Sequence, residues 1–133
     1  KAFQLAVVAP DRSVVDESVV SVIAPGAAGY FGVLSGHVPF VAALRPGLVE
    51  YEDEQSQRRF ITVSGGFAEV SEDKVTILAD AAERAEEIDV ARAERALEEA
   101  REALAGRESG QTTQEAVSEM ERAVNRLRAA QKL

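Results

Sequence analysis

The sequence predicts an all-β domain followed by an all-α domain, namely a β-sandwich of about ten short antiparallel strands and then an α-helical hairpin. All seven aromatic residues lie between Phe3 and Phe67, and all four prolines lie between Pro10 and Pro46. From Asp80 onward the chain is rich in Ala, Glu and Arg and has no aromatic residue or proline. We therefore expect a sandwich domain over residues 1–82 and a two-helix domain over residues 83–133.

The first domain consists of short β-branched or alternating apolar runs, separated by turn residues. Its turns are expected at the Pro-Asp-Arg-Ser cluster of residues 10–13, around Gly26 and Gly29, and at the polar tip over residues 52–57. The expected strands are 3–7, 13–15, 18–24, 33–34, 38–44, 48–52, 59–63, 67–70 and 74–78.

The second domain has two apolar stripes with helical spacing, one before Gly106 and one after Gly110. The first predicts a helix over about residues 89–105, and the second predicts a helix over about 113–131. Thr112 and Glu115 form a capping box at the start of the second helix. Both stripes are mostly alanine, and an alanine methyl contributes only about 0.8 kcal/mol against about 1.5–3 kcal/mol for leucine. The hairpin is therefore expected to be marginal and able to adopt another packing.

Composition and motif content exclude several classes of function. The chain has no cysteine and a formal net charge of -8, so thiolate metal sites and nucleic-acid binding are not expected. His37 is the only histidine, and no second soft ligand accompanies it. The glycines from Gly26 to Gly36 lack the Lys-Ser/Thr of a phosphate loop, and Ser64-Gly65-Gly66 lacks the nucleophile elbow of a hydrolase. We therefore predict no catalytic residue and no metal requirement, and we expect Ser64-Gly65-Gly66 to be a turn with positive φ.

Three arginines are brought together by an antiparallel hairpin. Arg122 and Arg126 are one helical turn apart on the second helix, and Arg92 lies in the first turn of the first helix. Their guanidinium groups would repel one another unless carboxylates or a bound polyanion compensate. Both interpretations stay open here, the first being salt bridges to Glu119, Glu121 and Asp89. Asp89 also suits the N-cap position of the first helix.

Four motifs follow one another along the first domain. They are Gly29-x-x-Gly32-x-x-x-Gly36-His37-x-Pro39, then Pro46-Gly47, then Ser64-Gly65-Gly66-Phe67-x-Glu69-Val70, and finally the run Val75-Thr76-Ile77-Leu78-Ala79-Asp80. In this order they resemble the epsilon subunits of F-type ATP synthases, and the resemblance covers nearly the whole chain. The likeness implies that family's ten-stranded β-sandwich and two-helix C-terminal domain.

The resemblance implies a non-catalytic subunit of the central rotor stalk that couples proton flow to ATP synthesis. Its partners would be the gamma subunit and the polar loops of the c-ring, with Tyr30, Phe31 and His37 at the rotor interface. Of these, Tyr30 and Phe31 are expected to be exposed, and His37 by itself suits a turn or packing role. It would lie peripherally at the cytoplasmic face of the bacterial plasma membrane as part of F1. Its helices would extend to restrain ATP hydrolysis, meeting an acidic loop of the beta subunits of the alpha/beta hexamer. The arginines suited to that contact are Arg92, Arg95, Arg101, Arg122, Arg126 and Arg128.

A further motif is similar to family members that bind ATP as a regulatory ligand in the folded hairpin. It reads Ile88-Asp89-Val90-Ala91-Arg92-Ala93 in this chain. By that likeness Arg122 and Arg126 would hold the phosphates of ATP. The residues expected at the nucleoside end are Glu83, Ile88, Asp89, Arg92 and Ala93. Two alternatives are a free-standing ATP-sensing module without a rotor partner and an adhesive sandwich that oligomerises through its helices.

Overall fold

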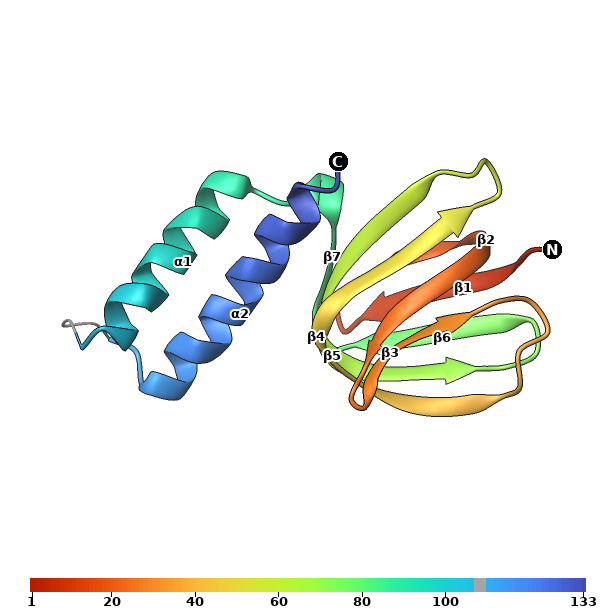
Figure 1. Ribbon diagram of the computed structural model, residues 1–133, viewed down its shortest axis with the longest axis horizontal. Coiled ribbons are helices and arrows are strands. Elements are labelled where there is room, and N and C mark those ends of the chain that lie inside the picture. The colour runs from red at the N-terminus through yellow and green to blue at the C-terminus, as the bar shows by residue number, and fades with distance from the viewer. Residues whose placement is uncertain (107–109) are drawn as a thin grey trace. The chain divides into compact units, whose positions relative to one another are not determined.

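A computed structural model of the protein describes residues 1–106 and 110–133 (Figure 1). It divides into two compact units, Lys1–Arg84 and Ala85–Leu133, and each is described here by itself. The first unit contains β-strands and the second contains helices, so the predicted fold class is confirmed. The predicted break between the helices runs from Gly106 to Gly110, and its residues 107–109 lie outside the described residues.

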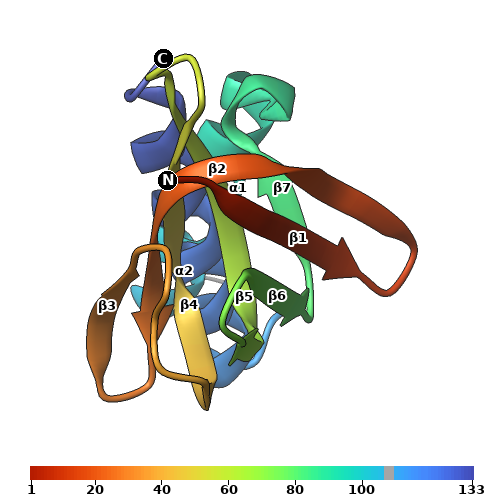
Figure 2. The ribbon, with the colours of Figure 1, turned by 90° about the vertical axis from the view of Figure 1, so that its right-hand side faces the viewer.

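The first unit is a sheet that closes on itself. In spatial order its strands run β1-β6-β5-β4-β2-β3, and β7 pairs with β5. β1 also pairs with β2, and this pairing closes the sheet into a flattened barrel (Figure 2). The β1–β6 pair is parallel, against the expectation of a wholly antiparallel sheet, because closure sets the first strand beside β6 in the same direction. The strands are β1 (Phe3–Ala9), β2 (Arg12–Gly26), β3 (Gly29–Val33), β4 (Phe40–Asp53), β5 (Arg58–Val70), β6 (Lys74–Ala79) and β7 (Ala82–Arg84).

The structure joins several of the short expected strands into longer, bent ones. β2, β4 and β5 have 15, 14 and 13 residues, and each spans two of the predicted segments. The expected turn at Ser64-Gly65-Gly66 is instead a bend inside β5, although the positive φ values of Gly65 (120°) and Gly66 (129°) agree with prediction. A Cβ on Gly66 would lie 2.0 Å from the Leu78 carbonyl oxygen, so only glycine permits this bend.

β5 keeps the same pairing register with β6 and with β7 on the two sides of this bend. Gly66 pairs with Ala79 on β6, and Val63 pairs with Ala82 on β7. Between the two segments, the Ser64 N–H donates to the Ala81 carbonyl at 3.1 Å and the Asp80 N–H donates to the Gly65 carbonyl at 3.0 Å. β6 and β7 therefore form one continuous neighbour of β5 that follows it around the corner of the barrel.

The core of the first unit is made by the inward residues of these strands. Period-2 alternation brings large apolar side chains inside, and Tyr51 is the largest of those that are fully buried. The others of this group are Leu5, Ile61, Ile77, Val7, Val15, Val19, Val22, Val49, Val63, Val70 and Val75. Burial of each such aliphatic side chain stabilises the fold by about 1.5–3 kcal/mol.

The second unit consists of a short 3-10 helix η1 (Ala85–Glu87) and the helices α1 (Val90–Leu104) and α2 (Thr113–Ala130). Asp89 and Thr112 are the two N-caps, and the Thr112 hydroxyl accepts a hydrogen bond from the Glu115 N–H at 3.1 Å. Gly106 ends α1 with a φ of 82°, the left-handed conformation common after helices. No helix in the described part of the chain is both long and apolar enough to cross a membrane.

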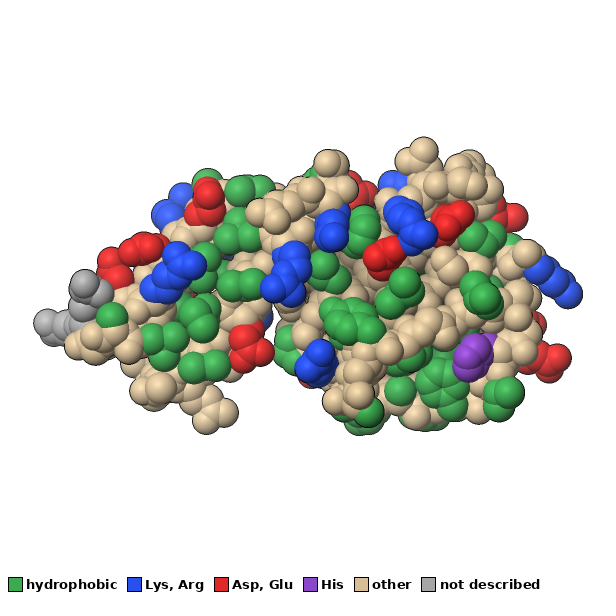
Figure 3. Space-filling view, in the orientation of Figure 1, with side chains coloured by type: hydrophobic (Ala, Val, Ile, Leu, Met, Phe, Trp, Pro, Cys, Tyr) green, Lys and Arg blue, Asp and Glu red, His purple; other side chains and the backbone are tan. Residues whose placement is uncertain are grey.

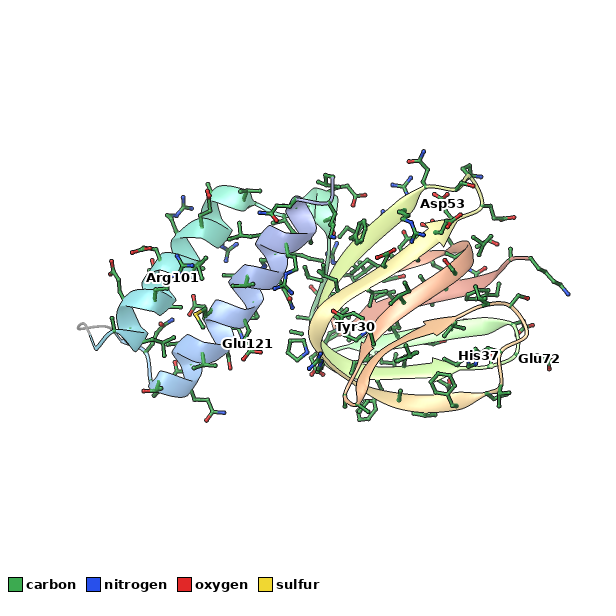
Figure 4. The ribbon with its side chains drawn as sticks, viewed as in Figure 1. Tyr30, His37, Asp53, Glu72, Arg101 and Glu121 are labelled. Atoms are coloured by element: carbon green, nitrogen blue, oxygen red, sulfur yellow. The ribbon has the colours of Figure 1, made fainter. Side chains whose placement is uncertain are left out.

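The hairpin between β4 and β5 is organised by the buried carboxylate of Asp53 (Figure 4). It accepts hydrogen bonds from the N–H groups of Gln55 and Gln57, both at 2.9 Å, and from Arg59 Nε at 3.2 Å. The hydrogen bond from the Gln57 N–H, supported by those from Arg59 and Gln55, holds the pKa of Asp53 below its ordinary value. The ionised carboxylate therefore stabilises the native hairpin.

Replacing Asp53 by Asn should destabilise the first unit at pH 7. Because the folded-state pKa is depressed, the stabilisation is present above the unfolded-state value of about 3.9 and is lost as pH falls through the folded-state value. The difference in urea midpoint between wild type and Asp53→Asn should therefore shrink toward acid pH. Near-UV circular dichroism measures this for the first unit alone, since every aromatic residue lies there. Glu54→Gln, on the exposed neighbouring residue, is the charge-matched control, and an unchanged midpoint difference at all pH values would contradict the assignment.

Candidate functional site

The antiparallel helices set the start of α1 beside the end of α2 (Figure 1). Arg92 lies exposed in the first turn of α1, and η1 also contacts α2. On α2, Arg122 is exposed and Arg126 is half-buried. The hairpin therefore has these three arginines at the same half of the second unit, as the sequence predicts.

The motif residues around the start of α1 have structural tasks of their own. The Asp89 carboxylate accepts a hydrogen bond from the Arg92 N–H at 3.1 Å and caps the helix. Ile88 is half-buried directly before this cap, and Ala93 is buried in the interface between the helices. One carboxylate oxygen of Asp89 is used by the cap, so the motif fixes where α1 begins.

The expected salt bridges do not account for Arg92 and Arg122. Glu119 accepts a hydrogen bond from the Gln111 side chain, and Asp89 is used by the helix cap. Within the residues that the structure describes, neither Arg92 nor Arg122 forms an ion pair. On the space-filling surface, blue and red side chains of the second unit both lie among apolar ones (Figure 3). Two exposed guanidinium groups thus have their charge available to an anion.

The remaining expected residue is Glu83. It belongs to β7 in the first unit, where its carbonyl oxygen accepts a hydrogen bond from Thr62 Oγ1 at 3.4 Å. The other six residues expected to bind ATP lie in the second unit: Ile88, Asp89, Arg92, Ala93, Arg122 and Arg126. The expected ATP-binding residues are thus divided between the two units.

The interface between the helices is an alanine seam, as the sequence predicts. Every buried side chain of α1 and α2 is an alanine. Ala93 and Ala100 are seven residues apart, as are Ala116 and Ala123, which is the spacing of one position in a coiled coil. Small side chains let the helices approach closely but remove little apolar area from water.

The expected rotor-interface residues have different environments. Tyr30 is 52% exposed near the start of β3, and its Oη accepts a hydrogen bond from the Leu48 N–H at 3.2 Å (Figure 4). Phe31 was expected to be exposed, but its ring packs against the core and meets Phe40 edge-on at a centroid distance of 5.4 Å. The reason is strand alternation, because neighbouring residues on β3 point to opposite faces. His37 is half-buried, with its ring centroid 5.3 Å from that of Phe40.

An exposed apolar surface that was not predicted lies on the outer face of β4, β5 and β6. Phe67 is 58% exposed, and it pairs with Ala43 on one side and Leu78 on the other. Val41 and Leu78 are 68% and 55% exposed. We call Val41, Ala43, Phe67 and Leu78 the β4–β6 patch. Strand parity could have revealed it, because Ala68 and Val70 point inward and so place Phe67 outside.

Comparison with known proteins places both units in one family. Residues 2–85 match the family described as ATP synthase, Delta/Epsilon chain, beta-sandwich domain, and residues 86–131 match ATP synthase, Delta/Epsilon chain, long alpha-helix domain. This chain belongs to the delta/epsilon chain family of ATP synthase. The boundary between the two matches lies within one residue of the division after Arg84.

The full-length relatives are bacterial ATP synthase epsilon chains. The chain is 44% identical over 128 residues to that of Nitratidesulfovibrio vulgaris, covering 96% of this chain and 95% of the relative. It is 43% identical over 129 residues to that of Moorella thermoacetica, covering 97% and 96%. Among solved structures, a chain of the Euglena gracilis mitochondrial ATP synthase, in a structure of OSCP, F1 and c-ring, has a TM-score of 0.76 at 30% identity. That alignment covers 99% of this chain and 82% of the other.

Proposed function

We propose that this chain is a non-catalytic coupling subunit of the central stalk of a bacterial F-type ATP synthase. In this role it would lie peripherally at the cytoplasmic face of the plasma membrane, with the gamma subunit and the c-ring as partners. Its helices would extend toward the alpha and beta subunits to restrain ATP hydrolysis, and they would bind ATP in the folded state. The observation that carries the proposal is a well-packed sandwich joined to helices whose fully buried side chains are all alanine.

The β4–β6 patch is the surface proposed to pack against the gamma subunit. Its members belong to three adjacent strands of a rigid sheet, so their side chains form a preorganised apolar surface. An exposed cluster of large apolar side chains is typical of an interaction site. Tyr30 and His37 lie at β3 and the loop that follows it, and we assign this region to the polar loops of the c-ring.

Phe67→Glu should weaken binding of the whole chain to purified gamma subunit by about 10- to 100-fold, because it would place a charge in an apolar interface. Leu34→Glu is the matched control, since Leu34 is 64% exposed and lies outside the β4–β6 patch. Binding is measured by titration calorimetry, and circular dichroism checks that each variant is folded. Unchanged affinity of a folded Phe67→Glu variant would refute this assignment, and no binding by the wild type would favour a free-standing ATP-sensing module.

The ATP site proposed on the helices depends on the three arginines. Arg122 and Arg126 are spaced to present both guanidinium groups to the phosphates, and guanidinium forks suit bidentate contact with phosphate oxygens. Arg92, Asp89, Ile88 and Ala93 would hold the nucleoside end. Because these residues come from both helices, ATP bound there would add to the folded hairpin a free energy that grows with its concentration.

Arg122→Ala and Arg126→Ala should each weaken ATP binding at least about tenfold, since each removes a charge-assisted contact to phosphate. Arg101→Ala is the matched control, because Arg101 lies in the last turn of α1 at the other end of the hairpin. Calorimetric titration of the whole chain with ATP measures the effect. The site is wrong if the wild type gives no binding at millimolar ATP, or if Arg101→Ala weakens binding as much as Arg126→Ala.

A further inference from the structure

A β-bulge interrupts the pairing of β1 with β2. The register passes from Val7 opposite Val15 to Val8 opposite Ser13, so Val14 has no partner residue on β1. Val14 is also 2% exposed. Bulges remove backbone groups from the ladder, and a buried carbonyl needs another donor.

The donor comes from the last residue of the first unit. Arg84 Nε donates a hydrogen bond to the Val14 carbonyl oxygen at 2.8 Å. Arg84 ends β7, and β7 lies close to β2 without pairing with it (Figure 2). The contact therefore joins two strands that the sheet itself leaves unconnected.

The Arg84 side chain also lies near a buried tyrosine. Burial, with the charge of Glu17 and a hydrogen bond to it, raises the pKa of Tyr51 to about 12, and the Arg84 guanidinium opposes that rise. Tyr51 is on β4 and Glu17 is on β2. Arg84 thus bonds to β2 and also acts electrostatically on a tyrosine of β4.

Pairing with β5 and side-chain hydrogen bonds also hold β7. The strand has three residues, which pair with residues 61–63 of β5. Two side-chain hydrogen bonds to its carbonyl oxygens are long, both 3.4 Å: Arg12 Nη2 to Ala82 and Thr62 Oγ1 to Glu83. So short a strand would readily leave the sheet if the chain beyond it moved.

We propose that Arg84 and the Val14 bulge form a clasp that fixes β7 in the sheet, so that any movement of the helical unit begins at Ala85. The bulge leaves the Val14 carbonyl oxygen to accept this hydrogen bond from the end of β7. Its part in regulation rests on the proposed function, because it would keep the sandwich intact while the helices change their packing. Arg84 acts here as a positioning residue, by holding β7 against β2.

Hydrogen–deuterium exchange on the whole chain tests the clasp without ATP or partners. In Arg84→Gln, amides of residues 82–84 should exchange at least tenfold faster, while those of β6 stay as in the wild type. Arg12→Gln is the matched control and should leave residues 82–84 protected. Arg84→Lys keeps the charge but not the guanidinium group, and it should show the same faster exchange at residues 82–84. This second variant provides the test if Arg84→Gln does not fold. Unchanged exchange at residues 82–84, or an equal increase across the whole first unit, would overturn the clasp.

The same measurement with and without ATP separates the clasp from the proposed function. In the wild type, residues 82–84 should stay protected in both conditions, whereas protection of the helices should rise with ATP. Loss of protection at residues 82–84 without ATP would overturn the clasp. If exchange of the helical amides does not change with ATP, the proposed nucleotide site is wrong. The comparison of Arg84 variants would still test the clasp in that case.

Discussion

The alanine seam between α1 and α2 is the constraint on which the behaviour of the chain depends. Each buried alanine methyl contributes only about 0.8 kcal/mol, so the seam supplies far less stabilisation than a leucine interface of the same length. Helices of 15 and 18 residues are close to the length at which isolated helices are marginal in water. Small free energies from a ligand or a protein partner are therefore enough to decide how these helices pack.

The first unit has the opposite character. Large aliphatic side chains fill its interior, the sheet closes on itself, and β5 keeps one register along β6 and β7. Such a body can present the β4–β6 patch without rearranging, which suits a permanent contact. The division after Arg84 thus separates a unit with a large aliphatic core from a unit whose fully buried side chains on the helices are alanines.

Much of this organisation follows from the sequence, because it depends on local patterns. Helical spacing and the caps Asp89 and Thr112 predict both helices, and the shift from aromatic to Ala-Glu-Arg composition predicts two domains. The sequence does not predict that short strands join into long ones, because glycines often end strands. In this chain Gly65 and Gly66 instead let β5 bend and continue. The parallel β1–β6 pair and the Val14 bulge depend on closure of the sheet, which no local pattern encodes.

The candidate sites show the same limit. The arginine spacing on α2 can be read from the chain, and so can the placement of Arg92 by an antiparallel hairpin. Whether the nearby carboxylates are already used depends on rotamers and caps, as Asp89 and Glu119 show. Phe31 was expected to be exposed and is not, and the exposure of Phe67 was not predicted. Exposure on a strand depends on parity, which must be counted from a buried neighbour.

The central claim is that the alanine seam leaves the helical unit much less stable than the sandwich. A urea titration of the whole chain, followed by circular dichroism at 222 nm for helix and in the near-UV for tyrosine, tests it most directly. The helical signal should be lost at a lower urea concentration than the tyrosine signal. ATP should raise the urea midpoint of the helical transition toward that of the tyrosine transition. One coincident transition, unaffected by ATP, would contradict it.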